Sequence, residues 1–294
     1  MLRIKAPASS ANLGPGFDCL GLALDVCNQF DVCLNETDIL ENVEDRYNNS
    51  DNLFLQAYRA GCQAIGISDH VRVNFDCRIP STRGMGSSAA FITAGVCAAS
   101  ALHNNALSKD EIFQIISRME GHPDNTAPCL YGGLTCSLKD EDGRFITRKM
   151  PLHDSWKFTL LVPDFEVSTK KAREILPESY SRKAVSETSS HAILLMHALA
   201  EGDEELLNTA CRDIIHEPYR TKLIDGYDTV RTIAETDTGG KTAVSGSGPA
   251  LLLISKKQLS KEAKMKIASI QEHSWNIIET RIAQEGIAIQ GISK

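Results

Sequence analysis

The segment from Pro80 to Ala90, PSTRGMGSSAA, combines small residues in a pattern that suits anion binding. Gly84 and Gly86 let the backbone turn tightly and leave no side chain between it and a ligand. Ser87 and Ser88 stand where the following Ala-rich helix begins, with hydroxyl and free N–H groups facing outward. Such N–H groups and the positive end of a helix dipole bind anions, most often phosphate. The segment therefore indicates a phosphate site, although a glycine turn that caps a core helix has the same composition.

The elements around this loop are those that a phosphate cradle requires. Val71, Val73 and Phe75 alternate with polar residues and predict a strand that leads to Pro80, and an almost uncharged helix follows the loop. The loop lacks both the Gly-Lys-Ser/Thr ending of a Walker sequence and the G-x-G-x-x-G spacing of a dinucleotide-binding turn. A phosphate site here would therefore belong to neither of these two classes.

A run of polar and turn-forming residues, from Glu120 to Asn125, follows the next amphipathic helix. That helix begins with the capping box of Ser108 and has one apolar face. Glu120 could hold a metal ion, and His122 and Asn125 could hydrogen-bond a ligand. A helix C-cap followed by a Pro-Asp-Asn turn is the commoner meaning of such a run.

Further polar residues stand beside turns in both halves of the chain. Asn12 and Asp18 flank a glycine-proline turn, where they could converge on a ligand or satisfy the turn backbone. Thr169 and Arg173 belong to a short basic segment, and Arg220 follows a proline break. Arginine suits a carboxylate or a phosphate, although a solvated helix face explains most basic patches.

Composition limits the classes of protein to which the chain can belong. With 294 residues, 42% of them hydrophobic, it can build a full core and two domains, with a boundary near residue 151. A net charge of -7 without a basic block argues against a nucleic-acid partner. Nine scattered cysteines without a C-x-x-C pair argue against a zinc or disulfide framework. No apolar run is long enough for a signal peptide or a membrane span, which predicts a cytoplasmic protein without a membrane partner.

Three glycine-rich segments, ANLGPGFD, PSTRGMGSSAA and SGSGPA, occur in an order that resembles the signature segments of the GHMP small-molecule kinases. The segments KAPASSANLGPGFDCLGLAL, GHPDNTAPCLYGG, KKAREILP and EPYR look most like the members of that family that phosphorylate homoserine. The resemblance covers essentially the whole chain. It implies ATP-dependent phosphorylation of the side-chain hydroxyl of L-homoserine, a step of threonine biosynthesis, with Mg²⁺ as the cofactor.

The resemblance also implies a fold. It is an α+β, two-domain GHMP kinase architecture, with a nucleotide-binding domain over residues 1–152 and a ferredoxin-like domain over residues 153–294. The N-terminal domain would resemble domain 2 of ribosomal protein S5 and contain a left-handed β-α-β crossover. Such crossovers are rare, so spacing alone does not predict this topology.

The resemblance assigns roles to individual residues. The nucleotide loop, whose N–H groups would hold the ATP phosphates, comprises Pro80, Ser81, Thr82, Arg83, Gly84, Met85, Gly86, Ser87, Ser88, Ala89 and Ala90. The substrate site comprises Asn12, Asp18, His122, Asn125, Thr169, Arg173 and Arg220. The ligands of Mg²⁺ would be Glu120 and a loop serine, Ser88 or Ser87. Asp18 would be the catalytic residue, either as a general base or as a group that orients the hydroxyl.

Three positions depart from the usual pattern of the family. Met85 replaces a leucine, a near-isosteric change. Arg83 stands where a small residue is frequent, and it either adds a phosphate contact or faces solvent. Glu120 lies only two residues before His122, closer than in some relatives.

Two other functions fit the same residues. The first is another GHMP kinase acting on mevalonate or shikimate, because the two arginines favour a carboxylate-bearing substrate over a sugar. The second is a non-catalytic, ligand-binding member of the fold. The sequence leaves the oligomeric state open, a homodimer included.

Overall fold

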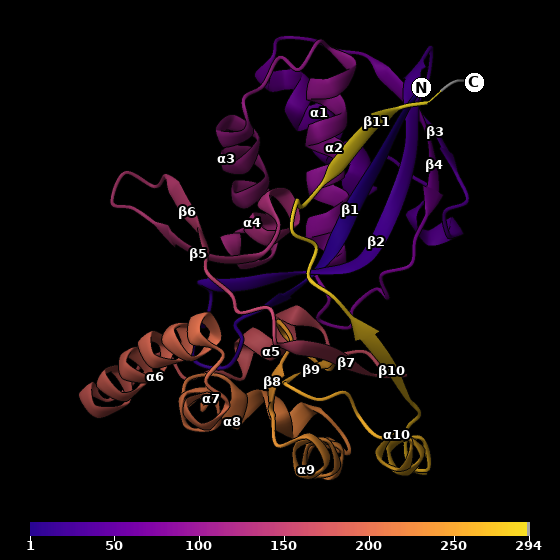
Figure 1. Cartoon of the computed structure of the whole chain (residues 1–294). Helices are drawn as coiled ribbons and strands as arrows, with labels where there is room; N and C mark the ends of the chain where they lie inside the picture. The colour runs from indigo at the N-terminus through magenta and orange to yellow at the C-terminus, as the bar shows by residue number, and fades with distance from the viewer. Residues whose placement is uncertain (293–294) are drawn as a thin grey trace.

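The computed structural model describes residues 1–292, which form two α+β units, each built on one sheet (Figure 1). The larger sheet has seven strands in the order β11-β1-β2-β4-β3, and β5 joins it by pairing with β2 and β6. Its strands are β1 (Leu2–Ala11), β2 (Leu20–Asn35), β3 (Ile39–Glu41), β4 (His70–Asp76), β5 (Leu134–Lys139), β6 (Phe145–Met150) and β11 (Ala288–Gly291).

Four helices pack with the larger sheet: α1 (Leu53–Ala64), α2 (Ser87–Leu102), α3 (Lys109–Glu120) and α4 (Pro123–Tyr131). Glycines allow α1 and α2 to approach closely. A Cβ atom on Gly61 would lie 2.6 Å from the Cβ of Ala99, and one on Gly95 would lie 2.4 Å from the carbonyl oxygen of Phe54. Such separations are far below van der Waals contact, so this packing requires glycine at both positions. The helix that follows the glycine loop is therefore held firmly in the core.

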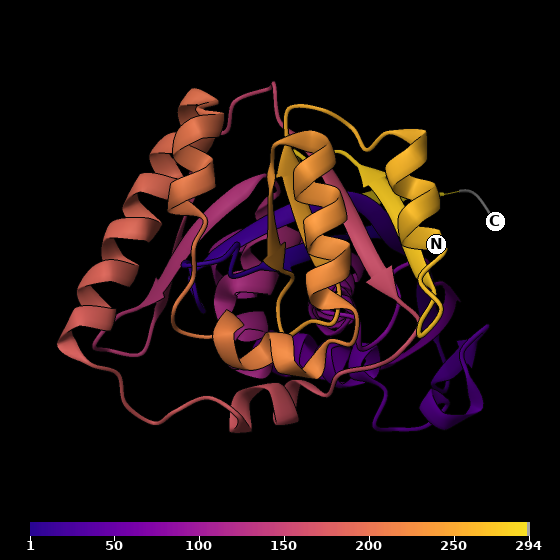
Figure 2. The same cartoon turned by 90° about the horizontal axis from the view of Figure 1, so that it is seen from below.

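The smaller sheet is antiparallel, with the strand order β10-β7-β9-β8. Its strands are β7 (Lys157–Pro163), β8 (Lys241–Val244), β9 (Leu251–Ser255) and β10 (Trp275–Thr280). Helices α9 (Tyr227–Thr238) and α10 (Lys261–Ala268) cover one face of this sheet (Figure 2). The sequence β7-α9-β8-β9-α10-β10 is the ferredoxin-like β-α-β-β-α-β arrangement.

A group of four further helices and a 3₁₀ turn lies between β7 and α9 in the chain. It comprises α5 (Thr169–Glu174), α6 (Arg182–Glu201), α7 (Glu204–Ala210), α8 (Glu217–Arg220) and the 3₁₀ turn Thr221–Leu223; another 3₁₀ turn, Asp45–Tyr47, precedes α1. Two of these helices, α5 and α8, carry the basic residues singled out in the sequence. Within the described residues, no helix combines the length and the apolar character needed to cross a membrane.

The predicted α+β, two-domain architecture is confirmed. Strands β3 and β4 are parallel, and α1 joins them, so a β-α-β crossover is present; its left-handedness stays a prediction. We keep 1–152 and 153–294 as the proposed division of the chain. The last strand of the second segment, β11, nevertheless pairs with β1 and completes the sheet of the first (Figure 1).

Candidate active site

The predicted site residues come together in a cleft of about 140 Å³ between the two units. Its lining includes every predicted substrate residue and the predicted metal ligands, namely Asn12, Asp18, Ser88, Glu120, His122, Asn125, Thr169, Arg173 and Arg220, together with Thr82 to Ser87 of the loop. Pro80, Ser81, Ala89 and Ala90 do not line this cleft. Ser81 lines a neighbouring cavity, and Ala89 and Ala90 are buried in the core.

Two glycines give the loop before α2 its shape. Gly84 and Gly86 have φ angles of 74° and 66°, in the left-handed region. A Cβ atom on Gly86 would lie 2.0 Å from Ser9 Oγ, and one on Gly84 would lie 2.1 Å from the carbonyl oxygen of Ser245. Gly86 is the N-cap of α2 and offers no side-chain bond, so the N–H groups of the first turn face the cleft without an internal acceptor.

A second glycine loop, residues 245–248, packs against the first from the smaller unit. Ser245 Oγ donates a 2.6 Å hydrogen bond to the carbonyl oxygen of Gly84. The N–H of Gly246 donates to the carbonyl oxygen of Ala11 at 3.1 Å, and Gly246 O accepts from Asn12 Nδ2 at 2.8 Å. This loop therefore fixes the two units to each other at the floor of the cleft.

Arg83 also ties the loop to the smaller unit. Its Nε donates to the carbonyl oxygen of Pro163 at 3.0 Å, and its Nη2 donates to that of Asp164 at 2.8 Å. Because of this link to the end of β7, the Arg83 side chain is largely buried and does not face solvent. Arg83 also lines the cleft, and a phosphate contact stays a prediction.

Glu120 and Ser88 form the site's candidate pair of cation ligands. Ser88 Oγ donates to Glu120 Oε2 at 2.8 Å, whereas no such bond involves Ser87 within the described part of the chain. Burial raises the pKa of the Glu120 carboxyl, and the Ser88 hydroxyl opposes that rise. A buried carboxylate and a hydroxyl are oxygen donors of the kind that Mg²⁺ prefers, so these residues fit the ion.

Next to this pair, His122 Nδ1 lies 2.5 Å from Asp124 Oδ1. Burial alone would lower the pKa of His122. The hydrogen bond to the Asp124 carboxylate and its negative charge raise that pKa by more, so the pKa of His122 is raised overall. Asp18, His122 and Asp124 also place one ligand atom each within 4.8 Å of one another, close enough to hold a cation. The cleft thus has two oxygen-rich corners.

Asp18 and Arg173 face each other across the cleft. Arg173 Nη1 and Nη2 donate to the two carboxylate oxygens of Asp18 at 3.1 and 2.9 Å. Asp18 has a φ of 55°, and its N–H donates to Asn12 Oδ1 at 2.9 Å. Because Asn12 also holds Gly246, both ends of its amide are engaged by the protein. Asn12 therefore orients Asp18 and joins the two loops.

Arg220 is buried, with only 2% of its surface exposed. Its Nε donates to Ala172 O at 3.2 Å and its Nη1 to Gly246 O at 3.0 Å. His216 Nε2 lies 2.9 Å from Gly14 O, which requires a proton on Nε2 and leaves Nδ1, 3.4 Å from Arg220 Nη1, as an acceptor. Burial lowers the pKa of His216, in keeping with a neutral ring.

Sequence reasoning missed several residues of the cleft. Asp124, Gly246 and Ser247 line it, and none of them received a role. Asp124 lies inside the run from Glu120 to Asn125, and the other two lie in the second glycine loop, so the segments were visible in the sequence. Thr169 Oγ1 lies 3.2 Å from Ser247 Oγ. A local pattern does not reveal that such distant segments meet.

Comparisons with known proteins agree with this arrangement. Residues 52–133 match the GHMP kinases N terminal domain, and residues 195–270 match the GHMP kinases C terminal domain. The chain is 35% identical to a homoserine kinase of Clostridium botulinum strain Langeland, with 98% of each chain covered. It is also 35% identical to a homoserine kinase of a Picosynechococcus species, covering 99% of this chain and 95% of the relative.

Solved structures have the same fold. The homoserine kinase of Cytophaga hutchinsonii superposes with a TM-score of 0.86 at 27% identity, over 98% of this chain and 97% of the other. A mevalonate kinase of L. major has a TM-score of 0.69 at 13% identity, over 96% of this chain and 95% of the other, and that likeness concerns the fold alone.

Proposed function

The chain belongs to the GHMP kinase family, and we propose that it transfers the γ-phosphoryl group of ATP to the side-chain hydroxyl of L-homoserine. One observation supports the choice of substrate: the glycine loop lines the same cleft as a carboxylate and a guanidinium, Asp18 and Arg173, that are paired with each other. The product would be O-phospho-L-homoserine, used in threonine biosynthesis.

The Asp18–Arg173 pair suits a zwitterionic substrate. An amino acid brings a carboxylate and an ammonium group, so it can replace the internal ion pair by two new pairs without leaving a charge unmatched. Arg173 would bind the substrate carboxylate through its two-pronged donor face, with Arg220 behind it. Asp18 would bind the ammonium group or orient the hydroxyl. Thr169, His122 and Asn125 line the remaining walls.

Phosphoryl transfer depends mainly on positioning and on charge neutralisation. The loop from Gly84 to Ser88 would bind the β- and γ-phosphates through main-chain N–H groups. Glu120 and Ser88 would hold Mg²⁺, which supplies positive charge beside the transferred group. Asp18 would accept the hydroxyl proton or align the hydroxyl for attack.

A neighbouring cavity of about 310 Å³ suits the nucleoside. It has a largely apolar wall that includes Val43, Tyr47 and Phe91, and it shares Ser87 and Ser88 with the cleft. The flat aromatic base of ATP needs such a surface. The shared serines lie where the phosphates of ATP would pass from this cavity into the cleft. We propose that ATP spans the two cavities.

The decisive measurement is ADP release with a panel of hydroxylated acceptors and the intact chain. Homoserine should be turned over with a kcat/KM far above those of serine, mevalonate and shikimate. Preference for mevalonate or shikimate would overturn the substrate assignment, and ATP binding without turnover of any acceptor would favour the non-catalytic alternative. We expect the enzyme to act in the cytoplasm. A monomer and a homodimer both fit, because one chain supplies the whole cleft.

A further inference from the structure

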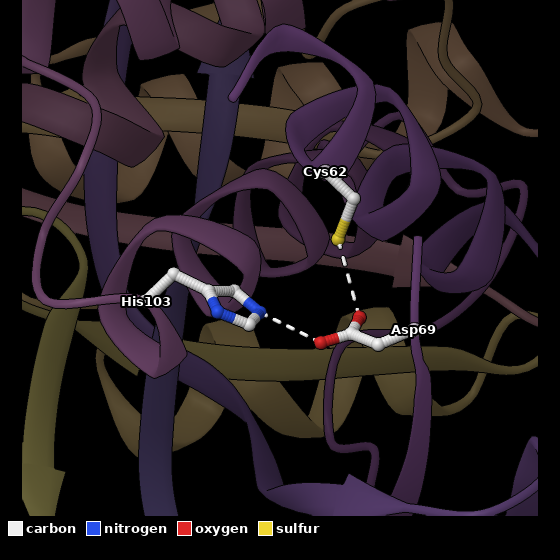
Figure 3. A group of neighbouring side chains, drawn as sticks. All are labelled: Cys62, Asp69 and His103. Atoms are coloured by element: carbon white, nitrogen blue, oxygen red, sulfur yellow. Dashed lines mark hydrogen bonds and ion pairs between the residues drawn. The ribbon is translucent and has the colours of Figure 1, made fainter. Parts of the chain in front are cut away.

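Three side chains of different chemistry meet at the end of α2 that lies opposite the glycine loop. Cys62 comes from α1, Asp69 precedes β4, and His103 is the C-cap of α2 (Figure 3). Helix α2 has 16 residues, so the cluster lies about 24 Å from the phosphate site at 1.5 Å per residue. We propose that Cys62, Asp69 and His103 bind a divalent transition-metal ion, with Zn²⁺ the best match.

The separations are those of a compact metal site. Cys62 Sγ lies 3.5 Å from Asp69 Oδ1, and His103 Nε2 lies 2.8 Å from Asp69 Oδ2. One atom of each residue falls within 4.8 Å of the other two. Tetrahedral zinc, with bonds of about 2.3 Å to sulfur and about 2.0 Å to oxygen, requires about 3.5 Å between those ligand atoms. Figure 3 shows the thiol and the imidazole both pointing toward the carboxylate. Small side-chain shifts would therefore admit the ion among the three groups.

His103 and Asp69 form the closest pair of the cluster. His103 Nε2 lies 2.8 Å from Asp69 Oδ2, and Figure 3 shows the two side chains pointing toward each other. Without metal, a proton on Nε2 joins the imidazole to the carboxylate. A metal ion bound by both groups would take the place of that proton.

A hydrogen bond from the neighbouring Tyr58 orients the Asp69 carboxylate. Tyr58 Oη donates to Asp69 Oδ1 at 2.6 Å, which leaves Oδ2 to face His103 and the ion. Such an outer hydrogen bond is typical of metal-ligating carboxylates. Without metal, the Cys62 thiol donates a hydrogen bond to Asp69 Oδ1 at 3.5 Å. Metal binding would replace that proton and convert the thiol to a thiolate ligand.

Donor type selects the ion. One thiolate and one carboxylate cancel the charge of a divalent cation, and the imidazole adds a neutral nitrogen donor. Sulfur and nitrogen ligands favour zinc over Mg²⁺ or Ca²⁺, which prefer oxygen. Three protein ligands leave a fourth position for water. The site would fasten the ends of α1 and α2 to the start of β4, and its role would be structural.

Co²⁺ can replace Zn²⁺ at such a site and, unlike Zn²⁺, absorbs visible light, so its spectrum tests the site directly. The full chain is stripped with chelator, and Co²⁺ is then titrated while absorbance is recorded. We expect a thiolate-to-cobalt charge-transfer band that saturates at one ion per chain and disappears on addition of Zn²⁺. Cys62→Ala and His103→Ala should lose the band. The matched controls Cys77→Ala and His70→Ala, which remove an exposed thiol after the far end of β4 and an exposed imidazole at its start, should keep it.

A second readout separates loss of metal binding from loss of folding. Zn²⁺ at one hundred times its Kd should raise the Tm of the chain by roughly 5 °C, and the rise should vanish in Cys62→Ala and His103→Ala while their circular dichroism stays native. Phosphorylation of homoserine with Mg²⁺ should proceed in the zinc-free chain, so this test is independent of the proposed function. A band that survives both substitutions, or that Cys77→Ala abolishes, would overturn the proposal.

Discussion

The carboxylate of Asp18 and the guanidinium of Arg173 form a two-pronged ion pair, at 2.9 and 3.1 Å, between the loop that follows β1 and helix α5, which belong to different units. Both side chains remain more than one-third exposed, so the pair contributes little to stability. Each partner is therefore free to exchange the other for a charged group of a substrate. That exchange makes the pair the centre of the predicted chemistry.

Replacing Arg173 with glutamine should weaken homoserine binding selectively. Removal of a two-pronged carboxylate contact should raise the KM for homoserine at least about tenfold and leave the KM for ATP within about twofold. Initial-rate kinetics with each substrate varied in turn provide the measurement. Lys170→Gln on the same helix removes an exposed charge that is paired only loosely with Glu174, and it should change neither constant. Equal rises in both constants for Arg173→Gln would refute the carboxylate role.

Asp18→Asn distinguishes a base from an orienting group. If Asp18 accepts the hydroxyl proton, kcat at saturating homoserine should fall by about 10²–10⁴-fold, because asparagine cannot take a proton. Single-turnover measurements would separate this step from product release. Near-normal turnover at saturation would exclude the base and leave an orienting role.

The magnesium requirement should depend on pH through Glu120. Burial raises the pKa of this carboxyl, so protons compete with Mg²⁺ at higher pH than they would at an ordinary glutamate, and the Mg²⁺ concentration required should rise as the pH is lowered from 8. Ser88→Ala removes the hydrogen bond that opposes the raised pKa and should shift the requirement to higher Mg²⁺ concentrations. Ser87→Ala is the matched control. Equal effects of the two serine substitutions would contradict the assignment of Ser88.

Gly86→Ala should disable the loop by a direct clash. The added Cβ would lie 2.0 Å from Ser9 Oγ and 3.0 Å from Asn125 Oδ1, in addition to the cost of a left-handed φ. Gly66→Ala imposes nearly the same φ, 73°, but its Cβ meets nothing within 4 Å. We expect Gly66→Ala to lose about 1 kcal/mol of stability and to keep its affinity for ATP, whereas Gly86→Ala should lose ATP binding by calorimetry. Intact ATP affinity in Gly86→Ala would show that this turn does not hold the phosphates.

Glu217 should make the stability of the fold depend on pH. Burial raises the pKa of this carboxyl from its ordinary value of 4.5 to about 8, and its Oε1 accepts a hydrogen bond from the N–H of Val244 at 2.7 Å. The folded chain therefore keeps a proton that the unfolded chain has lost, so the free energy of unfolding should fall as the pH rises from 4.5 to 8. The free energy of unfolding should fall by up to about 1.4 kcal/mol per pH unit in this range.

Urea unfolding at pH 6 and pH 9 provides the measurement for Glu217. Glu217→Gln keeps a neutral acceptor of similar shape and should remove most of the difference between the two pH values. Glu201→Gln, at the exposed end of α6, is the matched surface control. An unchanged pH dependence in Glu217→Gln would show that other groups cause it.

Local signals in the sequence were enough to predict several elements. The capping box at Ser108 is present, with Ser108 and Glu111 bonded to each other's backbone, and α3 ends at Glu120 as expected. The strand of Val71, Val73 and Phe75 is β4. The glycine loop leads into α2 as the composition indicated. In each of these segments, chemistry that spans a few residues decides the structure.

Other predictions failed where distant segments decide the structure. Residues 2–6 alternate between apolar and polar and predict a strand that Pro7 ends. Strand β1 instead continues to Ala11, because a register shift between Pro7 and Ala8 accommodates a residue without an N–H. The turn expected at Pro123 opens α4, since proline is well tolerated in a first helical turn. The structural roles of Asn12 and Arg83 depend on partners in the smaller unit, which no local pattern identifies.

The pairing of β11 with β1 also constrains how the molecule is made. Strand β1 lies at the start of the chain, yet one of its two neighbours, residues 288–291, is translated only after nearly all the rest. During synthesis this border of the sheet stays open, and the first half of the chain cannot reach its final form on the ribosome. We expect a nascent chain stalled before residue 288 to be markedly more sensitive to protease than the finished protein.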